Sequence, residues 1–299
     1  MEQNEIGLQY FVKLLNSKPL NTEEHTAAKW DIRADAWEKA YDEQKSTVRK
    51  GDDRIQGTVD YLKSRSALAP DYEVADVGCG PGRFAAAFAR DTRHVTGIDI
   101  SEKMINAASS YVKRENTNNV SFLLRDFQTV DVERENLAGK FDLVFSSLTP
   151  AVHGMAGLEK TMLMSRKYCC NITHIYSENV LEHRMMREIF ERGRTDPWEG
   201  NWRYFYAMFN ALFLMGYHPE ATYQKRRQEK YAYFDAERTN LFIEKMLPYT
   251  ERTKDNEKKI REWLLINEDK EGKFTEESTV MYGRLLWDVE DCRMGLRRL

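Results

Sequence analysis

The sequence predicts an α/β fold built around an open, mostly parallel sheet. Between residues 72 and 177, short apolar runs of strand length alternate with segments whose apolar residues recur at helical spacing. The first apolar run leads directly into a loop with three glycines, Gly78, Gly80 and Gly82, and the loop leads into a helical pattern. Strands that alternate with helices pair in parallel through right-handed crossovers, which defines the fold class.

Three helical segments are expected before the first strand. Apolar residues recur at intervals of three or four in residues 5–16, 22–44 and 53–65, and Pro70 lies beyond the last of these segments. The chain therefore places a helical region ahead of the sheet.

The alternating region supplies five strands and the helices between them. Each expected strand is a short run rich in apolar and β-branched residues. Ser101 has the side chain of an N-cap and begins the helix after the second strand. The expected strands are 72–78, 94–100, 120–126, 141–147 and 169–177, and the expected helices are 82–91, 101–116 and 157–168.

After residue 180 the alternation becomes irregular. Gly216 ends a strongly apolar helix and Asp235 caps another, while two further segments read as strands and bring the expected total to seven. The expected helices are 179–192, 202–216, 235–247 and 255–267, and the expected strands are 219–234 and 278–290.

The composition is that of a globular protein with a substantial core. Of the 299 residues, 41 % are hydrophobic and 31 % are charged, and the formal net charge is −3. Proteins that bind nucleic acid through its phosphates usually have more basic than acidic residues. The slightly negative net charge therefore argues against nucleic acid as the partner. The amino terminus has acidic residues where a secretory signal needs basic ones, and no apolar run approaches the roughly 18 residues of a membrane helix.

The four cysteines have the spacing neither of zinc ligands nor of a disulfide framework. Cys169 and Cys170 are adjacent, Cys79 lies in the glycine loop, and Cys292 lies near the end of the chain. No acidic cluster suggests a metal site either. A reducing cytoplasm, without a membrane partner, is the simplest expectation.

The glycine loop lies where open parallel sheets bind ligands, at the carboxyl ends of the strands. A dinucleotide fingerprint, G-x-G-x-x-G, would need a glycine at the position of Arg83, so this loop follows a different pattern. Asp76 precedes the loop, and the second strand ends in Asp99, whose carboxylate suits both hydroxyls of a ribose. Asp126 and Phe127, at the end of the third strand, suit the amine and the face of an adenine.

Four segments, taken together in their order and spacing, resemble the class I S-adenosylmethionine-dependent methyltransferases. They are DVGCGPG (76–82), GIDIS (97–101), LLRDF (123–127) and FDLVFSS (141–147). The resemblance implies a Rossmann-like seven-stranded sheet. The match covers roughly residues 72–177. Around it we expect three regions, which are a helical lid (1–70), a cofactor-binding core (71–180) and an α+β extension that completes the sheet and covers the acceptor site (181–299).

The resemblance also assigns roles to individual residues. Asp76 would help to orient the ammonium group of the cofactor, and Asp99 would bind its ribose hydroxyls. Ser146, at the end of the fourth strand, would lie near the ammonium and the transferable methyl group. The residues implied to bind S-adenosylmethionine are Arg33, Trp37, Asp76, Gly78, Gly80, Gly82, Asp99, Ile100, Met104, Asp126, Phe127 and Ser146.

Fewer residues in the sequence indicate where the methyl acceptor would bind. His153 follows the fourth strand and would suit a general base for a hydroxyl or thiol acceptor, the alternative being a solvent-exposed or helix-starting histidine. Aromatic residues between positions 198 and 209 either line the acceptor pocket, with Trp198 or Tyr206 favoured, or belong to the core.

Three functions are open at this point. The favoured one is methyl transfer to a small-molecule acceptor by a monomer or homodimer, because there is no basic excess and the fourth strand ends in SSLTP. Enzymes of this family that methylate amino groups of nucleic acids carry an Asn- or Asp-Pro-Pro-aromatic motif there. The second is methylation of a macromolecule, either protein or tRNA, and the third is cofactor binding without catalysis. The acceptor atom can be oxygen, nitrogen, sulfur or carbon on this fold.

Overall fold

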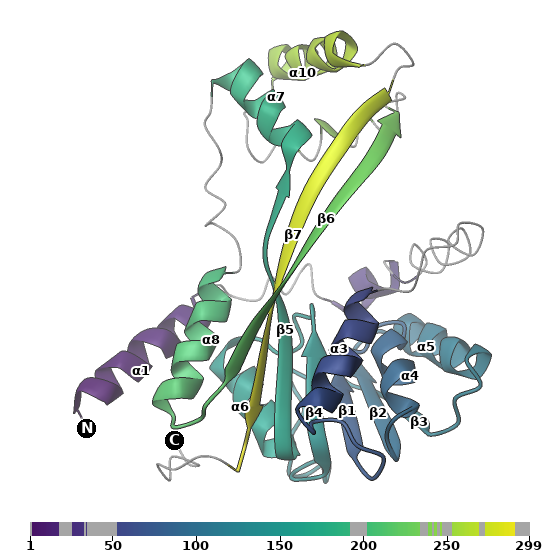
Figure 1. The fold of residues 1–299 in the computed structure, drawn as a ribbon, viewed down its shortest axis with the longest axis vertical. Coiled ribbons are helices and arrows are strands. Elements are labelled where there is room, and N and C mark those ends of the chain that lie inside the picture. Colours follow the sequence, from purple (N-terminus) through teal and green to yellow (C-terminus); the bar gives the residue numbers. More distant parts are fainter. Residues whose placement is uncertain are drawn as a thin grey trace. The chain divides into compact units, whose positions relative to one another are not determined.

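Seven strands form one sheet in the computed structural model (Figure 1). Their order across the sheet is β3-β2-β1-β4-β5-β7-β6. Neighbours from β3 to β5 pair in parallel, whereas the arrow of β7 runs opposite to those of β5 and β6 (Figure 1). The expected α/β class and the seven strands are confirmed. The strands are β1 (Glu73–Val77), β2 (His94–Asp99), β3 (Val120–Leu124), β4 (Phe141–Ser147), β5 (Ser165–Asn179), β6 (Glu220–Tyr233) and β7 (Lys273–Asp288).

The structure describes most of the chain, with gaps. The expected helices 22–44 and 235–247 lie largely outside the described residues. Within the described ranges, no helix is both long enough and apolar enough to cross a membrane. The described residues are 2–17, 26–32, 34, 53–191, 202–233, 239–240, 242–243, 246, 253–268 and 273–290.

The helices that position the glycine loop pack on the sheet through buried rings. The rings of Phe84 and Phe88 meet the ring of Phe145 in β4, with centroid distances of 4.7 and 4.9 Å. Phe88 and Phe145 are fully buried, so these contacts fix α4 and the loop before it against the strands. The helices are α1 (Glu2–Leu15), α3 (Asp53–Ser64), α4 (Arg83–Ala89), α5 (Glu102–Arg114), α6 (Gly154–Met164), α7 (Val180–Phe190), α8 (Trp202–Leu214) and α10 (Lys254–Asn267).

The order of the strands reverses at β1. Asp76 in β1 pairs with Gly97 of β2 on one side and with Phe145 of β4 on the other. The chain extends the sheet from β1 through β2 and β3, and then returns to add β4 at the opposite edge of β1. The loops after β1 and β4 therefore diverge, and a parallel sheet binds its ligands in the crevice at such a point.

The start of β5 differs from the expectation. The sequence pattern predicts a helix over 157–168 and a strand from residue 169, but the helix ends at Met164 and the strand begins at Ser165. Arg166 explains the difference, because its guanidinium lies 2.7 Å from the carboxylate of Asp142 in the neighbouring β4. This pairing between strands outweighs the helical spacing of the preceding residues.

The chain divides into two compact units. The first contains residues Met1–Thr173, Tyr204–Thr222 and Arg284–Leu299, and the second contains His174–Arg203 and Tyr223–Gly283. The second unit has its own apolar cluster, in which the indole nitrogen of Trp263 donates to the Glu188 carboxylate at 2.9 Å. The division of the chain at residues 70 and 180 stays a prediction.

Candidate functional site

The loop between β1 and α4 is held in a left-handed backbone conformation. Gly78, Gly80 and Gly82 have φ angles of 69°, 51° and 75°, which glycine adopts without the strain that a β-carbon causes. The N–H groups of Gly78 and Cys79 both donate to the carbonyl of Ile98 at the end of β2, at 2.8 and 3.1 Å. The loop is thus anchored to the neighbouring strand.

The three glycines differ in what lies beside them. A β-carbon on Gly78 would lie 2.0 Å from Thr149 Oγ1, and one on Gly82 would lie 2.8 Å from the β-carbon of Ala108 in α5. A β-carbon on Gly80 would meet no atom within 4 Å. Two glycines therefore serve packing inside the protein, and Gly80 is the one that leaves its main chain open to a ligand.

This difference gives matched expectations for Gly78→Ala and Gly80→Ala. Both variants take on left-handed strain of about 1 kcal/mol, and Gly78→Ala adds an overpacking cost of about 1–3 kcal/mol against Thr149. Urea unfolding should therefore show the larger loss of stability in Gly78→Ala. Adding Thr149→Gly should recover the packing part. Equal losses in the two single variants would contradict this assignment.

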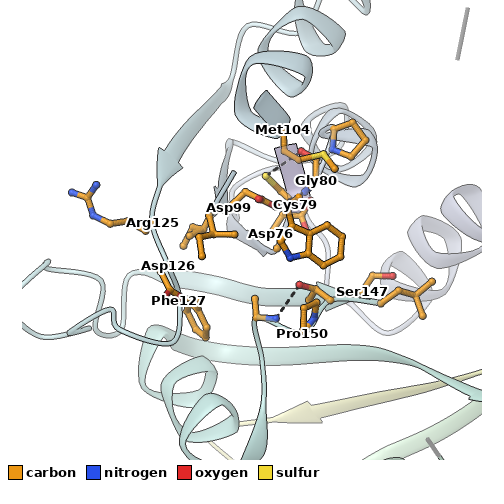
Figure 2. A pocket seen from close by; sticks show the side chains of 18 of the residues that line it. Asp76, Cys79, Gly80, Asp99, Met104, Arg125, Asp126, Phe127, Ser147 and Pro150 are labelled. Atoms are coloured by element: carbon orange, nitrogen blue, oxygen red, sulfur yellow. Dashed lines mark hydrogen bonds between the residues drawn. The ribbon is translucent and has the colours of Figure 1, made fainter. Parts of the chain in front are cut away.

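A cavity of about 670 Å³ lies at the carboxyl ends of β1, β2, β3 and β4. Figure 2 shows its wall, with Asp76 from β1, Asp99 from β2, Asp126 and Phe127 after β3, and Ser147 from β4. The helical segment 26–32, α3 and the first turn of α4 complete the wall. They contribute Thr26, Ala27, Trp30, Arg54, Arg83 and Phe84.

Asp99 is fixed by two backbone hydrogen bonds. Its Oδ2 accepts from the Gly80 N–H at 2.9 Å, and its Oδ1 accepts from the Ser101 N–H at 3.0 Å. Burial raises the pKa of the carboxyl above its usual range, although these hydrogen bonds favour the ionised form. Each carboxylate oxygen can accept further hydrogen bonds, so the group can bind two neighbouring hydroxyls of a ligand.

Asp76 is a buried carboxylate with an unused oxygen. The residue is 2 % exposed, and its Oδ2 has no hydrogen-bond partner among the described residues. Burial, followed by repulsion from the Asp99 charge, raises the pKa of Asp76 to about 7. A buried polar atom without a partner is costly, so this site favours a ligand that brings a hydrogen-bond donor or a positive charge.

Ser146 and Ser147 lie on opposite sides of β4, because successive side chains of a strand point to opposite faces. The hydroxyl of Ser146 accepts from Asn171 Nδ2 at 2.8 Å, and Ser146 is absent from the described wall of the cavity. Ser147 does line the cavity, and its buried Oγ has no partner among the described residues. The geometry thus offers Ser147 to a ligand in the place where the sequence suggested Ser146.

The residues that follow β2 and β3 add apolar side chains to the cavity wall. Ile100 and Met104 line it from the chain after β2, and Phe127, which is 2 % exposed, lines it after β3. Asp126 also lines the cavity, and its Oδ1 accepts from the Gln128 N–H at 3.0 Å. The ammonium of Lys160 donates to the carbonyl of Phe127 at 3.1 Å and steadies this loop.

The remaining expected residues are not part of the described cavity wall. Arg33, Trp37 and Trp198 lie outside the described residues. His153 precedes α6 and stacks on Tyr204 with 6.2 Å between ring centroids, while Tyr206 packs against Phe11. Of the described residues that line the cavity, none is His153, Tyr206 or Gly82. The roles proposed for His153 and Tyr206 stay predictions without support from this geometry.

Three arginines in the wall were not singled out from the sequence. Arg54 places its guanidinium 5.5 Å from the centre of the Phe84 ring, and Arg125 binds Glu135 at 2.9 Å. Arg83 begins α4 directly after the glycine loop. Arg83 and Arg125 adjoin motif residues and could have been found from them, whereas nothing near Arg54 in the sequence marks it.

Comparison with known protein families gives one matching model. Residues 74–164 match the model described as a methyltransferase domain. This segment runs from β1 to the end of α6 and includes Asp76, the glycine loop, Asp99 and Ser147.

Two curated relatives are named as methyltransferases. A sterol 24-C-methyltransferase of Gibberella zeae is 27 % identical over 139 residues, which are 44 % of this chain and 37 % of that protein. A ubiquinone biosynthesis O-methyltransferase of Coxiella burnetii is 31 % identical over 78 residues, 24 % of this chain and 33 % of that one. The chain thus spans about a third of the length of these relatives.

A solved magnesium protoporphyrin IX methyltransferase of Synechocystis with bound S-adenosylhomocysteine aligns with 78 % of this chain and 81 % of its own, at 14 % identity and a TM-score of 0.40. The fold assignment rests on the observed strand order rather than on this alignment.

Proposed function

We propose that this chain, which carries the cofactor-binding core of the class I S-adenosylmethionine-dependent methyltransferases, transfers a methyl group to a small-molecule acceptor. One observation carries the proposal: Asp76 Oδ2 and Ser147 Oγ are buried, lack partners among the described residues, and line one cavity together with Asp99. These groups call for a ligand that has both a cationic donor and a pair of hydroxyls.

The residues present fit S-adenosylmethionine. Asp76 and Ser147 would hold the ammonium group, and the open main chain of Gly80 would lie against the amino-acid part. Asp99 would accept both ribose hydroxyls, and the space between Met104 and Phe127 suits an adenine. When bound, this cofactor supplies a methyl group activated by a sulfonium. The protein's part is to align the acceptor with it and to exclude water.

A small acceptor is supported by the relatives and by the net charge. The cavity volume of about 670 Å³ falls in the range of small-molecule sites, which are roughly 300–1,000 Å³, and it accommodates the cofactor. The two curated relatives are named for a sterol and for ubiquinone biosynthesis. The net charge of −3 offers no general attraction for the phosphates of a nucleic acid.

We further propose a cytoplasmic location and a monomer or homodimer. The cytoplasm is a reducing compartment, and the free, buried thiols of Cys79, Cys169 and Cys170 support this location.

Calorimetry and a transfer assay test the proposal. The purified protein should bind S-adenosylmethionine and S-adenosylhomocysteine, with NAD as the control ligand that gives no heat. With a donor labelled in its methyl group, label should enter the small-molecule fraction of a cell extract. Label found only in protein or tRNA would overturn the acceptor class, and absence of binding to both cofactor forms would overturn the function.

Ser147→Ala and Ser146→Ala form a matched pair. Ser147→Ala removes a hydroxyl without a partner, so stability should hold while affinity for S-adenosylhomocysteine falls about fivefold or more. Ser146→Ala leaves Asn171 Nδ2 without its acceptor and should cost about 1–2 kcal/mol of stability, with affinity nearly unchanged. Thermal unfolding and calorimetry measure both effects, and a reversed pattern would refute the assignment of Ser147 to the ligand.

A further inference from the structure

The segment 26–32 covers part of the cavity. Thr26, Ala27 and Trp30 from this segment belong to the cavity wall. The segment is helical, and the Trp30 N–H donates to the Thr26 carbonyl at 3.1 Å. Its position over the cavity depends on what its other side chains contact.

Asp31 ties this segment to the start of α5. Its Oδ1 accepts a short hydrogen bond from the Ser101 hydroxyl and another from the Lys103 N–H at 3.3 Å. The first N–H groups of a helix lack partners within the helix and carry a partial positive charge. A carboxylate from outside the helix therefore binds well at this place.

Ser101 connects the same contact to the ligand-binding carboxylate. Ser101 is fully buried, its N–H donates to Asp99 Oδ1 at 3.0 Å, and its Oγ accepts from the Met104 N–H at 3.1 Å. Asp99 and Met104 both line the cavity, whereas Asp31 is not part of the described wall. A chain of hydrogen bonds thus runs from the covering segment to the site.

We propose that Asp31 is a positioning residue, which holds Trp30 over the cavity and keeps Ser101 in the orientation that anchors Asp99. The inference rests on the proposed function, because S-adenosylhomocysteine is the probe. Loss of the Asp31 carboxylate would release the covering segment, so the ligand would dissociate faster.

A purely electrostatic role predicts the opposite sign. The Asp31 charge raises the pKa of Asp99 through repulsion, so removing it alone would favour the ionised Asp99 and strengthen binding to hydroxyls. The direction of the change in affinity therefore separates positioning from charge.

Two variants of Asp31 and a control test the proposal by calorimetry and by dissociation rates with S-adenosylhomocysteine. Asp31→Ala should weaken binding about tenfold, mainly through faster dissociation, since hydrogen bonds to charged groups are worth about 1.5–3 kcal/mol. Asp31→Asn retains an acceptor oxygen and should restore affinity to within about threefold of the wild type. Asp60→Ala is the control, because Asp60 is exposed and accepts from Gln56 at 2.8 Å on α3.

Trp30→Ala and the double variant with Asp31→Ala complete a double-mutant cycle. A general structural defect would not reproduce the result expected of this cycle. If Asp31 acts through Trp30, the double variant should bind about as weakly as the weaker single variant, rather than showing the sum of both losses. Unchanged or tighter binding in Asp31→Ala, with a wild type that binds normally, would overturn the proposal and leave the function standing. A wild type that does not bind would overturn both.

Discussion

Replacing Asp99 with alanine is expected to weaken binding of S-adenosylhomocysteine by about 100-fold or more. The variant loses two charge-assisted hydrogen bonds to the ribose, each worth about 1.5–3 kcal/mol. It also releases the N–H groups of Gly80 and Ser101, which Asp99 fixes in the glycine loop and at the start of α5. The effect should therefore combine lost contacts with a less ordered site.

Calorimetry measures this loss, and two variants separate its causes. Asp99→Asn keeps one acceptor oxygen without the charge and should bind with intermediate affinity. Asp91→Ala removes a carboxylate that pairs with Lys63 at 2.6 Å, outside the described cavity wall, and should bind like the wild type. If Asp99→Ala bound S-adenosylhomocysteine within about threefold of the wild-type affinity, Asp99 would not be the residue that binds the ribose.

Replacing Asp76 with asparagine is expected to stabilise the free protein at pH 8 while abolishing most cofactor affinity. The folded pKa of about 7 lies above the usual aspartate value of 3.8. Between these two values the unfolded chain binds fewer protons than the folded chain, so the stability associated with Asp76 is fully present below pH 4. It decreases as the pH rises to about 7.

Asparagine escapes this loss because it carries no charge. Each pKa unit corresponds to about 1.4 kcal/mol, so the gain at pH 8 is on the order of 4 kcal/mol, or roughly 5–10 °C in melting temperature. At pH 4 the difference between the two proteins should nearly vanish. A destabilised Asp76→Asn protein at pH 8 would show that Asp76 serves the fold rather than a ligand.

Cofactor affinity should depend on pH through the same group. The ionised Asp76 binds the ammonium, and its fraction falls about tenfold between pH 8 and pH 6 for a pKa of about 7. Wild-type affinity for S-adenosylhomocysteine should fall by about that factor, whereas the weak residual binding of Asp76→Asn should change much less. Calorimetry at the two pH values measures both proteins.

The strand pattern carried enough information to predict the sheet. A buried strand such as β4 is one continuous apolar run, FDLVFSS, and its expected bounds of 141–147 agree with the structure. Five runs of this kind, with two less regular segments after residue 180, predicted seven strands. The start of β5 was missed because Ser165–Tyr168 joins the sheet through contacts with β4, which helical spacing in the sequence does not reveal.

The site was predictable to the residue only where chemistry marks a single position. Asp99 and Asp76 are the acids of their strand ends, so the motif identified them. Ser146 and Ser147 are chemically equal neighbours, and only the phase of the pleat decides which one faces the cavity. Arg54 comes from a helix before the sheet, where proximity to the site depends on packing rather than on a motif.

The contact between Gly78 and Thr149 links two loops that lie about seventy residues apart in the chain. Because a β-carbon at position 78 would lie 2.0 Å from Thr149 Oγ1, position 78 cannot gain a side chain without a loss of volume at position 149. In descendants of this gene, a side chain at position 78 should therefore be inherited only together with a smaller residue at position 149. Selection would therefore favour substitutions at these two codons that occur together.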